Sequence, residues 1–327
     1  MILLIEKLYI YTMETSLPYL IIIISGFLAY FIQKIFVRYK RFDDFNHRSS
    51  HETIATRTGG IGIFMTLLSV SICFYFNAIQ LFDYSLFIPL GIMFIVGVYD
   101  DFYNADFKLK FLLQIIVAKI IIDQGYVITN YYGLFGVYEV SWILAQLSTV
   151  FVFLVIINSI NFIDGIDGLA VTQVIKTILL IELFSFSGTA LTSLNVMLVL
   201  SLIPLYYFNF KKSKKVFLGD SGSLLLGTVV SICIFYVLGN DYEFKEAFLI
   251  NKVLFSVLVI LYPLVDLLRV FILRIKNGKS PFEADKNHLH HKLLSLKITK
   301  NHFTVVLFIL SIELTFTLLI LYFNDSF

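Results

Sequence analysis

Long uninterrupted stretches of Leu, Ile, Val and Phe are the feature of this sequence that most restricts its fold. A helix needs about 20 apolar residues, within a range of about 17–25, to cross the hydrocarbon core of a membrane. Only 15% of the 327 residues are charged, against about 25% in a typical soluble domain. We therefore predict an all-α, polytopic integral membrane helical bundle with about ten transmembrane helices. The ten candidate stretches are approximately 17–37, 60–77, 85–99, 109–124, 143–160, 168–186, 190–208, 222–238, 251–275 and 303–323.

The positively charged residues are unevenly divided among the predicted loops. Of the 25 Lys and Arg residues, 18 lie on the loops that follow odd-numbered helices: five in 38–58, two in 100–110, four in 209–221 and seven in 274–302. Cytoplasmic loops of membrane proteins carry the excess of Lys and Arg. The sequence thus predicts that these loops face the cytoplasm, that both termini are extracytoplasmic, and that the chain is a multi-pass protein of the cytoplasmic membrane.

The polar clusters that suggest chemistry lie on the same cytoplasmic loops. Five separate segments carry them, and a random distribution of polar residues would not place all five on one side of the membrane. We therefore predict a single transmembrane domain over residues 1–327. Its predicted catalytic loops lie near 38–59, 100–110, 158–168, 209–222 and 276–302.

Two adjacent carboxylates, Asp100 and Asp101, close the third predicted helix. Neighbouring carboxylates repel each other, and acidic residues at the C-terminus of a helix oppose its macrodipole. A solvated helix end is one interpretation of the pair. The other is a role in holding a hard metal ion or in transferring a proton.

A polar turn over residues 158–168 connects two apolar helices. Asn161, Asp164 and Asp167 are spaced three residues apart, so they share one side of a helical turn. Gly165 and Gly168 allow the backbone to approach a ligand closely. Amide and carboxyl groups are costly at membrane depth and usually line a functional cavity, so we predict that this turn is functional.

Asp220 stands immediately before the eighth predicted helix. It either caps that helix or binds a metal ion that faces phosphate groups. The lysines just upstream suit an anionic substrate, and they equally suit a positive anchor on the cytoplasmic side. They are Lys211, Lys212, Lys214 and Lys215.

The last cytoplasmic loop contains three histidines within four residues: His288, His290 and His291. Such a group could bind zinc. However, no cysteine is nearby to complete a structural site, and the adjacent His290 and His291 do not easily face one tetrahedral ion. We favour contacts with phosphate or diphosphate.

Several charged residues fall inside the predicted spans, where a charge is a functional hypothesis by default and an internal salt bridge is the alternative. Asp266 and Arg269 are three residues apart and are expected to pair. Pro263 is expected to kink the ninth helix. His302, at the start of the tenth, is expected to be interfacial. The other charged residues inside spans are Lys119, Lys176 and Glu182.

Five motifs appear in a characteristic order along the chain. They are Arg48-Ser-Ser-His51 with Gly59–Gly60, Asp100–Asp101 with Lys108 to Gln114, Asn158 to Gly168, Phe217 to Gly222, and His288-Leu-His290-His291. From about Asn46 to Lys292, the chain resembles the polyprenyl-phosphate N-acetylhexosamine-1-phosphate transferase family, glycosyltransferase family 4. The resemblance is closer to the GlcNAc-1-phosphate and O-antigen-initiating branch than to the peptidoglycan translocase.

The resemblance implies roles for particular residues. Asp100, Asp101 and Asp220 would be catalytic, and Asp220 and Asp101 would bind Mg²⁺, or Mn²⁺ in its place. Phe217 would stack on uracil. The other substrate-binding residues implied by the resemblance are Lys108, Lys110, Asn158, Asn161, Asp164, Asp167, Asn209, His288, His290 and His291.

The reaction implied by the resemblance moves N-acetylhexosamine-1-phosphate, with GlcNAc-1-phosphate expected first, from a UDP-sugar to undecaprenyl phosphate. UMP is released, and the product begins a cell-surface polysaccharide such as O-antigen, capsule or teichoic acid. The expected partners are the UDP-N-acetylhexosamine, undecaprenyl phosphate, membrane lipid and a second copy of the chain in a homodimer, with no nucleic acid.

Two alternatives stay open at this point. One is the same reaction with UDP-FucNAc, UDP-QuiNAc or UDP-MurNAc-pentapeptide. The other is a polytopic transporter of an anionic solute. Transporters usually bind their substrates near the membrane midplane and are often built from repeats, whereas the carboxylates here gather at one face and the sequence shows no repeat.

Overall fold

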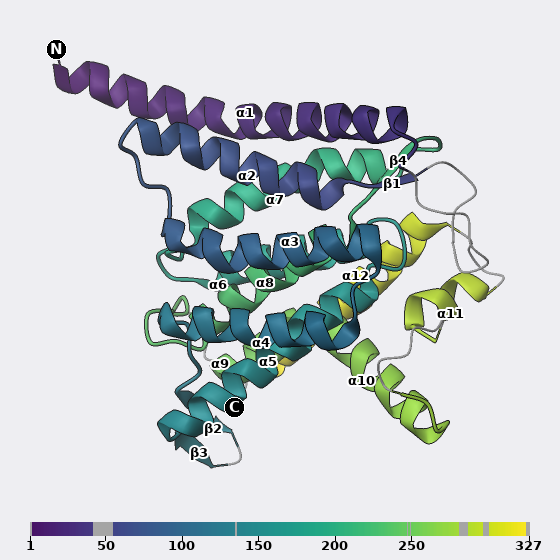
Figure 1. The fold of residues 1–327 in the computed structure, drawn as a ribbon. Coiled ribbons are helices and arrows are strands. Elements are labelled where there is room, and N and C mark those ends of the chain that lie inside the picture. The colour runs from purple at the N-terminus through teal and green to yellow at the C-terminus, as the bar shows by residue number, and fades with distance from the viewer. Residues whose placement is uncertain are drawn as a thin grey trace.

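The computed structural model describes residues 2–41, 55–134, 136–246, 248, 250–280, 287–296 and 301–324, with side chains described from 16 to 321. The long helices lie side by side, and their ends gather at two opposite sides of the bundle (Figure 1). This confirms the predicted all-α membrane bundle. The helices are α1 (Ile2–Arg38), α2 (Gly59–Phe76), η1 (Tyr84–Leu86), α3 (Phe87–Tyr103), α4 (Phe107–Asp123), α5 (Trp142–Ile163), α6 (Leu169–Phe184), α7 (Thr192–Asn209), α8 (Gly219–Val237), α9 (Lys252–Val259), α10 (Leu261–Lys276), α11 (Leu289–Ser295) and α12 (His302–Asn324).

The helix at the centre of the bundle is α8. Nearly all of its side chains are buried, and it packs mainly against α3 and α5, as expected for a helix that is apolar on all sides. Gly97 makes the contact with α3 very close, because a Cβ at this position would lie only 2.4 Å from the carbonyl oxygen of Asp220. The backbones of α3 and α8 therefore touch near the end of α3 that carries Asp100 and Asp101.

Apolar side chains cover much of the outside of the bundle. Phe27, Ile143 and Phe151 are 63%, 70% and 66% exposed, a pattern that suits lipid as the surrounding solvent. Within the residues that the structure describes, seven helices are long and apolar enough to cross a membrane, and an eighth span results if α9 and α10 are taken together. The chain is a multi-pass membrane protein.

All ten predicted stretches are helical in the structure. However, α4 has only 17 residues and α6 only 16, which is at or below the lower limit of about 17 for a span. The count of ten transmembrane helices and the side on which the termini lie stay predictions.

The ninth stretch is broken into α9 and α10, which meet at an angle of 76°. The expected kink is confirmed, and the break falls at Ile260, three residues before Pro263. Proline has no N–H to donate to the carbonyl four residues earlier, which here belongs to Val259. The hydroxyl of Thr177 on α6 donates to that carbonyl instead, at 2.7 Å.

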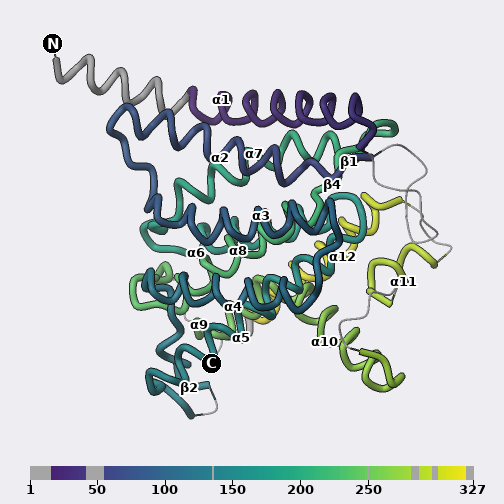
Figure 2. Tube along the Cα trace, in the orientation of Figure 1, coloured from purple at the N-terminus to yellow at the C-terminus, as the bar shows by residue number. Residues whose placement is uncertain are grey.

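Two short two-stranded sheets accompany the helices, and the all-α prediction did not include them. β1 (Ala55–Arg57) pairs in parallel with β4 (Lys215–Phe217), whereas β2 (Asn130–Leu134) pairs antiparallel with β3 (Val137–Glu139). The β1–β4 pair lies at the same side of the bundle as α11, opposite β2 (Figure 2). It places Arg57 and Phe217 beside the end of α3 and the start of α8.

Candidate active site

Three segments far apart in the sequence meet around Asp220, the second residue of α8. The ammonium of Lys110, near the start of α4, donates to Asp220 Oδ1 at 3.1 Å and to Asp100 Oδ2 at 2.6 Å. Asn161 Nδ2, near the end of α5, donates to the same Asp220 oxygen at 2.5 Å and to Ser223 Oγ at 2.7 Å. The structure thus brings four predicted site residues together, and we call Asp100, Lys110, Asn161 and Asp220 the Asp220 cluster.

The carboxylate of Asp101 binds the backbone at the start of α8, whereas that of Asp100 binds Lys110. Its two carboxylate oxygens accept hydrogen bonds from the backbone N–H groups of Asp220 and Ser221, each at 2.9 Å. Gly219, with φ of +74°, allows this approach, because a Cβ there would lie 2.7 Å from the Asp101 carboxylate. The capping role considered for Asp220 is therefore filled by Asp101 from a neighbouring helix, with Arg57 Nη1 3.9 Å away.

The two aspartates of the turn between α5 and α6 have opposite environments. Burial, followed by the negative charges of Asp220, Asp101 and Asp167, raises the pKa of Asp164 well above its usual range. Burial alone would also raise the pKa of Asp167, but hydrogen bonds from His302 and Lys215 outweigh it and lower that pKa. Asp164 therefore lies in a buried environment near other carboxylates, while the charge of Asp167 is balanced by Lys215 and His302.

His302 is a contact that the sequence prediction missed. It was expected to be interfacial, whereas its Nδ1 lies 2.9 Å from Asp167 Oδ2. Lys215, at the start of β4, also donates to this carboxylate oxygen. The two partners hold the α5–α6 turn between α12 and β4. No local motif signals the contact, since His302 and Asp167 are 135 residues apart.

Residues 287–291, which we call the histidine loop, are anchored to α10. His288 Nδ1 lies 2.6 Å from Asp266 Oδ2, and the N–H of Leu289 donates to the other oxygen of Asp266 at 2.8 Å. The expected pair of Asp266 with Arg269 is confirmed at 3.3 Å. Asp266 therefore holds the start of α11, and through it the histidines, against α10.

His290 is fully buried, and its ring packs against the α5–α6 turn. A Cβ at Gly165 would lie 2.4 Å from His290 Nε2. Burial, followed by the charges of His291 and His288, lowers the pKa of His290 to about 3, so the ring is neutral at physiological pH. The substrate-binding roles of His288, His290 and His291 stay predictions, as does any part played by 42–54, 281–286 and 297–300, which lie outside the described residues.

Four other predicted site residues lie outside the Asp220 cluster. Asn158 Nδ2 donates to Gln114 Oε1 of α4 at 2.9 Å, and Asn209 Nδ2 donates to the carbonyl of Val216 at 3.0 Å. Lys108 is exposed, and Phe217 is half-buried at the end of β4. The structure gives the two asparagines bracing contacts, and the substrate roles expected for all four residues stay predictions.

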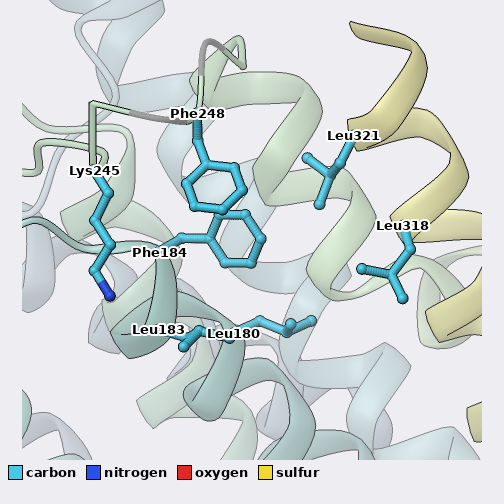
Figure 3. Close-up of a pocket in the computed structure, with 7 residues that line it drawn as sticks. All are labelled: Leu180, Leu183, Phe184, Lys245, Phe248, Leu318 and Leu321. Atoms are coloured by element: carbon cyan, nitrogen blue, oxygen red, sulfur yellow. The ribbon is translucent and has the colours of Figure 1, made fainter. Parts of the chain in front are cut away.

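A pocket of about 430 Å³ lies away from these residues. It is lined by Leu183 and Phe184 of α6, by Lys245 and Phe248, and by residues of α12 (Figure 3). Leu183 and Phe184 lie at the end of α6 opposite the α5–α6 turn. The pocket is almost entirely apolar and is not part of the candidate active site.

The chemistry of the Asp220 cluster fits a hard divalent cation, although no three His, Cys, Asp or Glu side chains form a ready metal site in the described part of the chain. Carboxylate and amide oxygens are the ligands that Mg²⁺ prefers, and the cluster with Asp164 supplies them. Asp100 and Asp101 each have both carboxylate oxygens hydrogen-bonded, so the metal-binding role expected for Asp101 beside Asp220 stays a prediction.

Comparison with known proteins finds a family similar to the part of the chain that carries this geometry. The model of "Glycosyl transferase family 4" matches residues 84–238, a range that contains the whole Asp220 cluster. Over these residues the chain is similar to glycosyl transferase family 4. The family match and the curated relatives identify the chain as an enzyme of the transferase class.

Curated relatives of the chain extend the family match beyond residues 84–238. A "Probable undecaprenyl-phosphate N-acetylglucosaminyl 1-phosphate transferase" of Bacillus subtilis is 28% identical over 89% of this chain and 80% of its own length. An "Undecaprenyl-phosphate alpha-N-acetylglucosaminyl 1-phosphate transferase" of Pasteurella multocida is 29% identical over 94% of this chain and 88% of its own length. The enzyme with the same description from Escherichia coli K12 is 25% identical over 90% and 80%. The family resemblance therefore includes the segments that carry β1 and the histidine loop.

Proposed function

We propose that this chain transfers GlcNAc-1-phosphate from UDP-GlcNAc to undecaprenyl phosphate and releases UMP. The relatives are described as acting on undecaprenyl phosphate and an N-acetylglucosaminyl 1-phosphate group, which supports this acceptor and this transferred group. The structural observation that supports the proposal most directly is the Asp220 cluster, in which one lysine bridges two carboxylates at the ends of membrane helices. At such a position a water-soluble nucleotide sugar and a membrane-bound phosphate can meet.

The proposed step joins a phosphate oxygen of the lipid to the phosphorus nearest the sugar, and it breaks the phosphoanhydride bond to UMP. Both reactants are anionic, so positive charge must offset their repulsion as the bond forms. Lys110 supplies a positive charge, which Asp100 holds in place at 2.6 Å. Asn161 fixes the carboxylate of Asp220.

Mg²⁺ is part of this proposal, held by Asp220 with Asp101, Asp100 or Asp164, and Mn²⁺ could replace it. When bound, the ion would supply electrostatic stabilisation of the diphosphate and of the departing UMP. The α5–α6 turn, held by Lys215 and His302 through Asp167, would contact the nucleotide side of the donor. Phe217 would provide the stacking surface for uracil.

The proposed orientation places the Asp220 cluster on the cytoplasmic side of the cytoplasmic membrane. The concentration of 18 of the 25 Lys and Arg residues on the loops of that side supports it. UDP-sugars are made in the cytoplasm, so the donor would reach the cluster directly. The homodimer stays a prediction.

The test is release of UMP by purified protein in detergent, with undecaprenyl phosphate, Mg²⁺ and a panel of UDP-N-acetylhexosamines. We expect release with UDP-GlcNAc, and loss of release with EDTA or in Asp220→Asn. Asp123→Asn is the matched control, because Asp123 is an exposed carboxylate at the other end of α4 that pairs only with Lys119 among the described residues. Release with a different sugar would correct the donor. No release with any donor, from a monodisperse protein, would refute the proposed function.

A further inference from the structure

A second group of charged residues lies deep inside the bundle, outside the Asp220 cluster. Lys176 of α6 and Glu313 of α12 form an ion pair with 2.5 Å between Nζ and Oε1, and each side chain is only 4% exposed. Lys176 also donates to Gln173 Oε1 at 2.8 Å. The same Glu313 oxygen accepts a hydrogen bond from the backbone N–H of Tyr262 at 3.0 Å.

This ion pair is a costly way to hold α6 against α12. Removing two charges from water carries a penalty that their attraction often fails to offset, and apolar residues of similar volume frequently stabilise such a contact better. Inside a membrane, charged residues usually mark function. The pair therefore needs a purpose other than packing two helices together.

The purpose suggested by the contacts is the support of the bend between α9 and α10. The first N–H groups of a helix have no partner within it, and inside a membrane bundle there is little water to supply one. Glu313 supplies the acceptor for Tyr262, the second residue of α10, while Lys176 neutralises Glu313. Thr177, next to Lys176, donates to the carbonyl of Val259 on the other side of the bend.

The bend in turn determines where the histidine loop lies. Asp266 of α10 holds His288 and the start of α11. The hydroxyl of Tyr262 is 3.4 Å from His290 Nδ1, and the His290 ring packs on Gly165 beside Asp164. A continuous series of contacts therefore connects the Lys176–Glu313 pair to the turn that carries Asp164 and Asp167.

We propose that Lys176 and Glu313 are positioning residues of the transferase, which fix the direction of α10 and thereby place the histidine loop against the α5–α6 turn. The inference rests on the proposed function, since the effect is read in the rate of UMP release. Neither residue touches the Asp220 cluster, so both act only through α10.

Two double variants without buried charge test this inference. Lys176→Met/Glu313→Gln keeps a side-chain carbonyl oxygen that can accept from Tyr262, whereas Lys176→Met/Glu313→Leu does not. We expect the Gln variant to keep kcat within about threefold of the wild type, and the Leu variant to lose at least about tenfold, because small misplacements of active-site groups reduce kcat strongly. The KM for the UDP-sugar should change much less than kcat.

The control is Glu182→Gln, which alters a carboxylate bonded to Thr189, Thr192 and Asn195 at the other end of α6. It should leave kcat unchanged. Equal kcat values in the two double variants, with melting temperatures like that of the wild type, would overturn the inference. If the wild type itself releases no UMP, the proposed function fails instead.

A milder variant covers the case in which the Leu variant does not fold. Thr177→Val keeps the shape of the side chain and removes only the hydroxyl that donates to Val259. We expect it to lower kcat about threefold or more, consistent with the loss of one hydrogen bond, with little change in KM. An unchanged kcat in folded Thr177→Val would count against the proposed control of the bend.

Discussion

Lys110→Gln is the substitution that probes the proposed chemistry most directly. Lys110 is only 13% exposed and lies between Asp100 and Asp220. Removing its charge leaves the two carboxylates without the cation between them, and it takes away the cation that faces the diphosphate in the proposed reaction. Loss of one positioned donor typically lowers kcat about 10²–10³-fold, or about 2.7–4 kcal/mol of transition-state stabilisation. We expect a fall of this size in UMP release.

A double-mutant cycle with Asp100→Asn separates the contact between Lys110 and Asp100 from other effects. Because the hydrogen bond between them is charge-assisted and 2.6 Å long, we expect a coupling of about 1.5–3 kcal/mol. The assay is kcat and KM for UMP release at saturating undecaprenyl phosphate, together with the melting temperature of each variant. Lys119→Gln is the matched control, because Lys119 is an exposed lysine of the same helix that pairs with Asp123. Equal losses in Lys119→Gln and Lys110→Gln, or strict additivity in the cycle, would refute the assigned role of Lys110.

Three further predictions concern packing and pH. Gly97→Ala should lower the free energy of unfolding by about 1–3 kcal/mol through overpacking, because its Cβ would lie 2.4 Å from the Asp220 carbonyl oxygen. Gly91→Ala should not, because the atom nearest to its Cβ would be 3.8 Å away. Thermal unfolding of both variants checks this difference. The raised pKa of Asp164 means that the folded protein holds a proton that the unfolded chain releases, so stability should fall as pH rises from the ordinary aspartate range through the raised pKa. Melting temperatures measured against pH should show this fall in the wild type and not in Asp164→Asn. The lowered pKa of Asp167 acts in the opposite direction: its contribution is present above the ordinary pKa and is lost as pH falls through the lowered one, so Asp167→Asn should lower the melting temperature at neutral pH and flatten its acid-side decline.

The sequence contained enough information to predict the helices and much of the site. Apolar stretches predicted the helices because an isolated stretch of about 20 apolar residues has few other stable forms in a membrane. Four residues of the site could be predicted as a group, because each lies near a helix end on the side that the charge distribution predicts to be cytoplasmic. They are Asp100, Lys110, Asn161 and Asp220. Lys108 was selected with Lys110 from its position alone, and only packing shows that one faces the cluster and the other is exposed.

The contacts that could not be predicted join residues far apart in the chain. The cap that Asp101 provides for α8 depends on the close approach of two backbones at Gly97 and Gly219, which no helical periodicity reveals. The contact between His302 and Asp167 likewise depends on where α12 packs. Short parallel strands such as β1 and β4 carry too few residues for an alternating pattern to be recognised.

The cap formed by Asp101 restricts how the site can bind anions. The N-terminus of a helix is usually a ready place for phosphate, because its free N–H groups and dipole favour negative charge. At α8 the N–H groups of Asp220 and Ser221 are already bonded to an internal carboxylate. In the proposed reaction, the diphosphate of the donor would therefore be held by side-chain cations and by the proposed metal ion. An inhibitor designed to place an anionic group at the start of α8 would meet the Asp101 carboxylate instead of a vacant anion site.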